Sequence, residues 1–203
     1  MSLPLAFKTQ IDTIPNRTPY ISANPEKLLH WKDKLGIHDR PRVGLVWSGG
    51  FRADQPELWT VNERRNISFA HIPKLNNKDI NFYSLQKGEP AESDLKKNLE
   101  IYWPQSNFIN YADKLVDFSD TAALIMNLDV VISVDTSVAH LAGALGKSVY
   151  LLNRYDSCWR WSEKNLYSIW YPSIKKFNSA KPLDWEKSIQ QIIEFEYPKL
   201  LTS

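Results

Sequence analysis

Residues 119–152 hold the pattern that most constrains the fold. Two continuous apolar runs of strand length, at residues 130–134 and 148–152, are each preceded by a stretch with the composition of a helix. Strands that are apolar on both faces are typical of parallel sheets covered by helices, and their crossover connections are right-handed. The sequence therefore predicts an α/β fold, a Rossmann-like parallel sheet with helices on both faces.

Capping residues set the limits of the two helices in this segment. Ser119 or Asp120 is expected to cap the first, TAALIMNLD, because a short polar side chain can accept hydrogen bonds from the first amides of a helix. Asp135 and Thr136 are expected to cap the second, SVAHLAGALG, which ends at Gly146.

Other parts of the chain add strands to the same sheet. Apolar runs at residues 43–47 and 80–85 predict two strands, and a shorter one is expected at residues 115–117. Between the first two, residues 48–66 are expected to form a long polar loop. The charged region between residues 86 and 115 has no clear period, and no element is assigned to it.

Two further helices follow from their caps and apolar stripes. Asn24 as N-cap and Pro25 at the first helical position predict a helix that ends at Gly36. Asp184 is expected to begin the last helix. The expected stripes are Leu28, Leu29 and Leu35 in the former, and Ile189, Ile192, Ile193 and Phe195 in the latter.

Two domain units are expected. Residues 1–23 lack a helical or strand period and are expected to form an extended segment that lies on a neighbour, the tail of a missing N-terminal domain. Residues 24–203 are expected to form the Rossmann-like domain, including the C-terminal helix.

Composition narrows the class of partner. The 25 Lys and Arg residues nearly balance the 23 Asp and Glu residues, so the chain lacks the charge excess of a nucleic-acid binder. Its single cysteine, Cys158, cannot form an internal disulfide, which fits a reducing compartment. No apolar stretch is long enough to span a bilayer and no signal peptide is recognisable, so a cytoplasmic protein is expected.

The expected helix start at Thr136 has the components of a phosphate site. Helix N-termini present unpaired amides and a partial positive charge, and Thr136 and Ser137 are small enough to let a phosphate approach while adding hydroxyl donors. His140, one turn further on, can donate to a phosphoryl oxygen or a ribose hydroxyl. Asp135 is better suited to orienting the loop, because two anions repel. The same residues also make an ordinary helix cap.

Three more polar loops follow predicted strands, at residues 48–50, 86–88 and 153–156. Because parallel strands end at one edge of the sheet, we expect these loops to lie beside the helix start at Thr136. Gln86 and Lys87 are expected near the nucleotide or ribose.

Charged and aromatic residues near these loops have two interpretations. Either Arg64 or Arg65 reaches a diphosphate, where a guanidinium binds bidentately, or both are only a solvated pair. Asp156 and the tryptophans of residues 159–161 can hold a base or sugar, although such indoles are more often packed in a core. The chain has no nucleophile elbow, HExxH motif or P-loop, which leaves hydrolase and ATPase functions without support.

The block DFSDTAALIMNLDVVISVDTSVAHLAGALGKSVYLL resembles the C-terminal domain of heptosyltransferase-like, family 9 glycosyltransferases. VGLVWSGG, RRNISF, FYSLQKG, WRW, WYPS and the DW-containing final helix extend the resemblance over most of the chain. It looks closest to a bacterial group in which this domain follows tetratricopeptide repeats, a group distantly similar to O-linked N-acetylglucosamine transferases. The resemblance implies the C-terminal half of a GT-B fold, in which two Rossmann-like domains face each other across a cleft.

The resemblance also implies which residues hold the nucleotide sugar. Such domains contact it through a strand-end Asp-Thr-Gly and a following His, which match Asp135, Thr136, Ser137 and His140, with serine in place of the glycine. Their small-residue loop after the first strand matches Ser48 and Gly49, and their cationic phosphate contact matches Arg65.

These enzymes invert the sugar without a metal or cofactor, so the donor, a nucleotide diphosphate sugar, is the ligand that the resemblance implies. Their general base lies on the N-terminal domain. The chain is therefore expected to bind donor and to need an acceptor-binding N-terminal domain for transfer.

Two other hypotheses stay open. A non-catalytic interaction module would dock a protein partner or a second copy of itself on the surface that once faced an N-terminal domain. A Rossmann-like enzyme using NAD or S-adenosylmethionine would be expected to carry GxGxxG after the first strand, and this sequence has SGG followed by Phe51.

Overall fold

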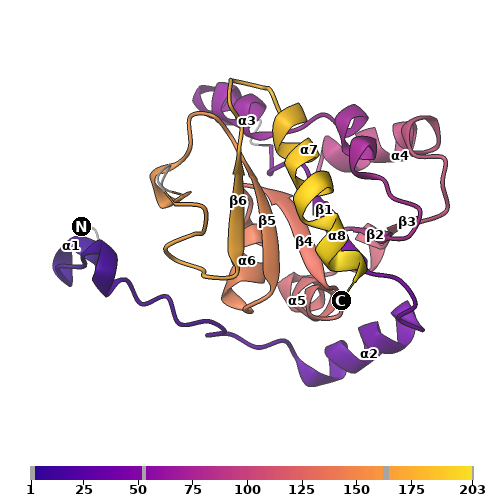
Figure 1. Cartoon of the computed structure of the whole chain (residues 1–203), viewed down its shortest axis with the longest axis horizontal. Helices are drawn as coiled ribbons and strands as arrows, with labels where there is room; N and C mark the ends of the chain where they lie inside the picture. The colour runs from indigo at the N-terminus through magenta and orange to yellow at the C-terminus, as the bar shows by residue number, and fades with distance from the viewer. Residues whose placement is uncertain (1–2, 52–53, 162–164, 203) are drawn as a thin grey trace.

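The computed structural model describes residues 3–51, 54–161 and 165–202, which form a sheet with helices on both sides (Figure 1). Within these residues six parallel strands have the order β3-β2-β1-β4-β5-β6. They are β1 (Arg42–Val46), β2 (Asn81–Ser84), β3 (Phe108–Asn110), β4 (Val130–Val134), β5 (Ser148–Asn153) and β6 (Ile174–Asn178). This is the strand order of Rossmann-like sheets. The predicted fold class is confirmed.

The helices cover both faces of the sheet. On one face lie α2 (Pro25–Leu35), α5 (Phe118–Met126) and α6 (Ser137–Ala144). On the other lie the 3-10 helix η3 (Phe69–Leu75), α4 (Ala91–Tyr102), α7 (Glu186–Phe195) and α8 (Tyr197–Leu201), of which α7 and α8 are in front of the sheet in Figure 1. None of the helices in the described residues is long and apolar enough to cross a membrane.

Alternation along the strands builds a core on each face. In β4, Val130, Ile132 and Val134 pack into the cluster beneath η3, α4 and α7, whereas Val131 packs into the cluster beneath α5 and α6. Since both faces are buried, every strand position must be uncharged or internally paired. This requirement produces the continuous apolar runs of the sequence.

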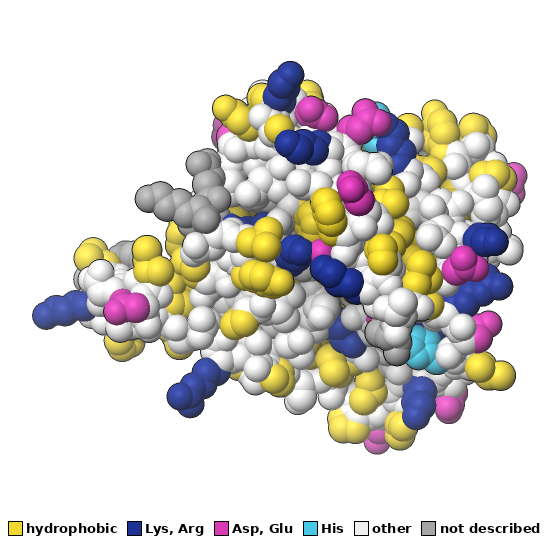
Figure 2. Space-filling model, in the orientation of Figure 1, with side chains coloured by type: hydrophobic (Ala, Val, Ile, Leu, Met, Phe, Trp, Pro, Cys, Tyr) yellow, Lys and Arg dark blue, Asp and Glu magenta, His cyan; other side chains and the backbone are white. Residues whose placement is uncertain are grey.

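The N-terminal segment runs along the outside of the domain (Figure 1). It is not extended throughout, because it contains two short helical pieces, α1 (Leu3–Ala6) and η1 (Ile11–Thr13). Near its end the amide of Tyr20 donates to the carbonyl of Ala144 at 3.0 Å. Hydrophobic side chains are exposed on and after α1, at the left of Figure 2.

The helix predicted after Asn24 is present and ends at Gly36, as expected. Its apolar stripe differs from the prediction, because Leu29 is 61% exposed whereas Trp31 is buried against α5. The helix predicted from Asp184 is α7, which begins at Glu186 and is followed by the short α8, and its Phe195 is exposed. Helical period alone does not say how wide the buried stripe is.

The strand predicted at residues 115–117 is wrong. The third strand is β3, whose residues Phe108–Asn110 pair with β2. Leu115 is buried but Val116 is 85% exposed, and Asp117 is the N-cap of α5. The prediction of Ser119 or Asp120 as that cap is corrected as well. The Asp117 carboxylate accepts hydrogen bonds from the Ser119 and Asp120 amides, so the cap lies two or three residues before the expected one.

Several elements escaped the sequence analysis, among them two helices and an edge strand. The predicted loop at residues 48–66 contains the 3-10 helix η2 (Pro56–Leu58) and α3 (Trp59–Arg65), and the charged region before β3 contains α4. The edge strand β6 was not predicted either, because two lysines interrupt the apolar pattern of its sequence, IKKFN. Lys176 of β6 is buried, and its ammonium group donates to the Trp161 carbonyl.

The remaining 3-10 helices lie in loops between these elements. They are η4 (Ala112–Lys114), which precedes α5, and η5 (Trp159–Trp161), which follows β5.

Candidate functional site

A cavity of about 830 Å³ lies at the carboxyl ends of β1, β2 and β4. Its described lining comprises Val46, Ser48, Gly49, Gly50, Phe51, Asn62, Arg65, Leu85, Gln86, Lys87, Leu115, Val116, Asp117, Phe118, Thr121, Thr136, Ser137 and Val138. β1 and β4 are the neighbouring strands from which the strand order runs in opposite directions. Open parallel sheets bind ligands at this switch point, where the loops separate.

The structure brings most of the sequence-predicted site residues to this cavity. Those that line it are Ser48, Gly49, Arg65, Gln86, Lys87, Thr136 and Ser137. Asp135, His140 and Asp156 do not belong to its described lining. The lining residues come from the ends of different strands and from α3, so only the parallel sheet brings them together.

The Gln86 side chain holds the loop after β1 in place. Its Oε1 accepts hydrogen bonds from the amides of Trp47 and Ser48, at 3.2 and 2.9 Å. Its Nε2 donates to the carbonyls of Ser48 and Lys87, at 2.9 and 3.2 Å. Each polar atom of this buried amide thus makes two hydrogen bonds within the protein, which gives Gln86 a positioning role at the cavity wall.

Arg65 supplies a guanidinium group to the cavity. Its Nη2 donates to Asn62 Oδ1 at 2.6 Å, and its Nη1 donates to the carbonyl of Asp135 at 3.3 Å. The group also lies against Gly49, where a β-carbon would be 2.4 Å from Nη2. Arg65 therefore connects α3 to the loop after β4, across the loop after β1.

Thr136 is the N-cap of α6, as the sequence predicted. Its Oγ1 accepts a hydrogen bond from the Ala139 amide at 3.4 Å and lies 3.0 Å from Ser133 Oγ. Ser137, the first residue of the helix, is exposed and lines the cavity. The first turn of α6 thus faces the cavity with the positive end of its dipole.

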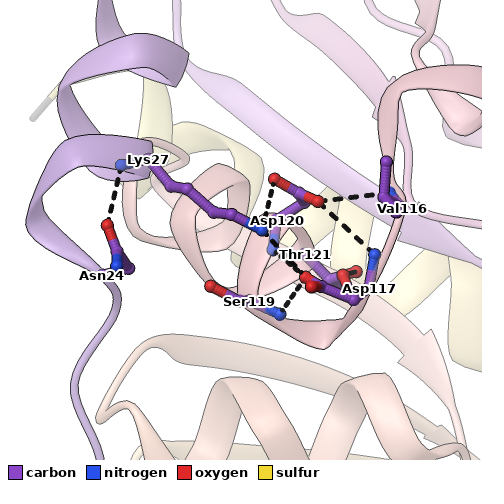
Figure 3. Close-up of polar contacts among 7 residues, drawn as sticks. All are labelled: Asn24, Lys27, Val116, Asp117, Ser119, Asp120 and Thr121. Carbon is purple, nitrogen blue, oxygen red and sulfur yellow. Dashed lines mark hydrogen bonds and ion pairs between the residues drawn. The ribbon is translucent and has the colours of Figure 1, made fainter.

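The N-terminus of α5 forms another wall of the cavity, and Figure 3 shows the polar contacts around it. Asp117 lies on this wall, and Lys27 of α2 places its ammonium group 3.0 Å from both Asp117 Oδ1 and Asp120 Oδ1. Hydrogen bonds from the Asp120 amide and from Lys27 hold the pKa of Asp117 below its usual range. The carboxylate on the wall is therefore ionised, and Lys27, which also faces Asp120, offsets part of its charge.

Lys87 is the second cation of the lining. It is exposed, and its Nζ donates to the carbonyl of Ala112 at 2.7 Å. Arg65 lies at the end of α3 and Lys87 in the loop after β2, so the described lining carries two cations and the Asp117 carboxylate, whose charge is partly offset by the Lys27 that it shares with Asp120. This balance favours an anionic ligand.

His140 lies in an aromatic cluster outside the cavity lining. Its ring stacks on Trp161 with centroids 4.9 Å apart, and its Nδ1 is 3.2 Å from the hydroxyl of Tyr171. Its Nε2 is 3.8 Å from Asp135 Oδ1. Burial lowers the pKa of His140 from its ordinary value of 6.5, against the opposing effect of the Asp135 charge.

Asp156 and Arg64 form an ion pair outside the cavity. The Nη1 atom of Arg64 lies 2.6 Å from Asp156 Oδ2. The two adjacent arginines of α3 therefore differ in role, because Arg64 binds the loop after β5 whereas Arg65 lines the cavity.

Residues that sequence reasoning missed at this site include Phe51, Asn62, Asp117 and the distant Lys27. Asn62 and Arg65 are three residues apart, the spacing that places two side chains on one helix face. This spacing is visible in the sequence, but it indicates a shared helix face only if residues 59–65 are assigned to a helix, and the sequence analysis assigned them to a loop. No local sequence pattern connects Lys27 with Asp117.

In the described residues, no group of three or more His, Cys, Asp or Glu side chains is arranged to hold a metal ion.

No family model matches the chain. Protein FlbA of Caulobacter vibrioides is 28% identical to it over 197 residues, which are 92% of this chain and 30% of that protein. The structure of E. coli ADP-heptose LPS heptosyltransferase II superposes on it with a TM-score of 0.63 and 13% identity, over 94% of this chain and 56% of that chain. The chain thus spans less than two thirds of either protein. At this identity the superposition establishes the fold: the chain is a Rossmann-like α/β domain of the kind found in GT-B glycosyltransferases.

Proposed function

We propose that the cavity binds the diphosphate of a nucleotide-sugar donor, and that the chain is the donor-binding part of a glycosyltransferase-like protein. The observation that carries this proposal is the position of Arg65, whose guanidinium lines the cavity together with the first turn of α6. A planar cation and a helix N-terminus are the two groups that bind phosphate oxygens best in the absence of a metal.

The charge distribution supports a diphosphate in particular. Arg65 of α3 and Lys87 of the loop after β2 offer two cations on different elements, which suits a ligand with two neighbouring anionic groups. Lys27 offsets the charge of Asp117, so the carboxylate on the wall repels an anion less. Thr136 and Ser137 add hydroxyl groups beside the first amides of α6.

The apolar part of the lining suits a nucleotide base. Leu85, Leu115, Val116, Phe118 and Val138 lie in the same cavity, and Val116 and Phe118 are exposed. A base has apolar faces that gain from such contacts. Asp135, His140 and Asp156 are outside the described lining, so the proposal assigns them no contact with the diphosphate.

Transfer in this proposal needs a further domain that binds the acceptor and carries the general base, as in the glycosyltransferases that the sequence resembles. The isolated chain is expected to bind donor and to transfer nothing. Differential scanning fluorimetry against UDP, ADP, GDP and their sugar conjugates tests the binding, because a ligand that binds only the folded state raises the melting temperature.

Adjacent arginines provide a matched control. Arg65→Gln is expected to weaken diphosphate binding by about 10- to 100-fold, since a hydrogen bond to a charged group contributes roughly 1.5 to 3 kcal/mol. Arg64→Gln removes the same charge from the same helix but outside the cavity, and is expected to change affinity much less. Equal effects of the two substitutions would exclude a direct contact from Arg65.

A second candidate function is an interaction module that docks a partner or a second copy of the chain. The observation that favours it is the exposure of Leu3, Leu5, Phe7 and Ile11 in the N-terminal segment (Figure 2). Exposed apolar groups so close together are typical of interfaces. Light scattering with size-exclusion chromatography tests self-association, and Leu5→Ser with Phe7→Ser should abolish it.

A further inference from the structure

We infer that the N-terminal arm, residues 14–23, positions α6, and that docking of the arm is coupled to anion binding in the cavity. In Figure 1 the arm runs along the outside of the domain between α1 and α2. A contact and a ligand that both favour one position of a rigid helix strengthen each other. The inference rests on the proposed function, in which the first turn of α6 binds a diphosphate.

The arm is attached to the end of α6 that does not line the cavity. The amide of Tyr20 donates to the carbonyl of Ala144, the last residue of α6, at 3.0 Å. Pro19 lies beside Gly146, since a β-carbon at that glycine would be 3.4 Å from the proline ring. These contacts hold the C-terminal end of the helix.

Tyr171 connects the arm to the middle of α6. Its hydroxyl oxygen lies 3.5 Å from that of Tyr20 and 3.2 Å from His140 Nδ1. Its ring packs directly on the helix at Gly143, where a β-carbon would be 2.7 Å from Cγ of Tyr171. His140 and Gly143 are three residues apart, so they share one helix face. The arm, Tyr171 and α6 therefore form one packed unit.

The packing of α6 on the sheet makes the helix sensitive to this unit. Its buried residues are all small: Ala139, Ala142, Gly143 and Ala144. Small side chains make fewer interlocking contacts than large ones, so contacts on the outer face matter more for the position of the helix. Packed helices shift as units, and a shift of α6 moves Thr136 and Ser137 at the cavity.

A second connection leads from Tyr171 towards Arg65. His140 Nε2 is 3.8 Å from Asp135 Oδ1, and the main-chain carbonyl of Asp135 accepts a hydrogen bond from Arg65 Nη1 at 3.3 Å. His140 thus lies between Tyr171 and the loop that holds the guanidinium group. In this inference it is a positioning residue that does not itself touch the anion.

Isothermal titration calorimetry with UDP, ADP and GDP tests the effect of the arm on affinity. Tyr20→Phe and Tyr171→Phe are each expected to weaken binding of the preferred diphosphate by about two- to fivefold, within the range of one hydrogen bond. Tyr20→Phe added to Tyr171→Phe should cause no further loss, because the partner hydroxyl is already absent. The melting temperature of each variant without ligand shows that it is folded.

Tyr102→Phe is the matched control. Tyr102 lies on α4, is 44% exposed and is outside the described lining of the cavity. The substitution removes the same hydroxyl group from an exposed tyrosine and should leave the diphosphate affinity unchanged.

Limited proteolysis tests the coupling in the opposite direction, because coupling between two sites is reciprocal. Trypsin cleaves after the exposed Arg17 when the arm detaches, and a saturating diphosphate should slow this cleavage at least twofold. Cleavage after Lys8, which precedes the arm, is the internal control and should keep its rate. Tyr171→Phe should reduce the protection at Arg17, which a purely structural role of this tyrosine would not do.

Two outcomes overturn the inference. If a diphosphate binds but Tyr20→Phe and Tyr171→Phe change its affinity no more than Tyr102→Phe, or if the ligand does not slow cleavage after Arg17, the arm is not coupled to the cavity and the proposed function stands. If no diphosphate binds the wild-type chain, the proposed function fails and the inference fails with it.

Discussion

The guanidinium group of Arg65 lies so close to Gly49 that a β-carbon at position 49 would be 2.4 Å from Nη2 and 2.6 Å from Cζ. A real β-carbon does not approach another heavy atom so closely. The absence of a side chain at Gly49 is therefore what allows Arg65 to lie across the loop after β1. This relationship explains why the loop needs a glycine although its sequence is not a dinucleotide-binding motif.

Gly49→Ala is predicted to displace Arg65 and to weaken diphosphate binding by about tenfold, the loss expected for one charge-assisted hydrogen bond. Stability should change little, because the clashing group is the mobile end of a side chain. Gly50→Ala is the control, because it adds the same methyl group to the neighbouring position of the cavity lining, where a β-carbon would meet no protein atom within 4 Å and would leave Arg65 in place. Calorimetric titration measures both affinities, and equal losses would contradict the role assigned to Gly49.

Gln86→Leu is predicted to lower the free energy of unfolding by roughly 1 to 3 kcal/mol, the cost of leaving buried amides without an acceptor. The amides concerned belong to Trp47 and Ser48. Urea unfolding measures the change. Gln190→Leu, on the exposed side of α7, should have little effect, and a similar loss in both variants would argue against a special role for Gln86.

His140 is predicted to make stability depend on pH below neutrality. Its folded-state pKa lies below 6.5, so between that value and 6.5 the unfolded chain binds a proton that the folded chain does not. Stability therefore falls as pH decreases below about 6.5 and is unaffected by this group above it. His140→Gln should flatten the fall of melting temperature between pH 7.5 and 5, and an unchanged profile would refute this. The exposed His30→Gln is the control.

Lys27→Met is predicted to weaken diphosphate binding by about two- to threefold at low salt, because it leaves the charges of Asp117 and Asp120 uncompensated at the cavity wall. The effect should shrink as ionic strength rises, since the pair is accessible to solvent. Lys32→Met, an exposed position on the same helix, should have little effect. Calorimetry at two salt concentrations checks this, and a salt-independent loss would point to a change in structure.

The sequence by itself predicted the central part of the fold. The runs at β1, β2, β4 and β5 are apolar on both faces. Such runs are typical of a parallel sheet that is covered by helices on both sides. Thr136 and Asn24 were recognisable as caps because N-cap chemistry is local. The expectation that loops after different strands meet at one edge followed from the parallel arrangement alone.

Elements with weak local signals were missed or misplaced. β6 is an edge strand whose lysines are accommodated by particular partners, and α3 is a short helix with little apolar period. The misplaced strand at residues 115–117 shows the same limit, because Leu115 and Val116 are apolar but only Leu115 is buried. Burial depends on what packs against a residue, and a short window of sequence does not contain that information.

Only the tertiary structure decided how the site is assembled. It separated Arg65 from Arg64, directed the side-chain amide of Gln86 to the loop after β1 and to the Lys87 carbonyl, and placed His140 on Trp161 outside the cavity lining. It also joined Lys27 to Asp117, residues that lie far apart in the chain. Secondary structure follows from periodicity and caps, which act over a few residues. The direction of a side chain and its partners follow from packing between segments that are distant in the chain, and only the folded structure brings these segments into contact.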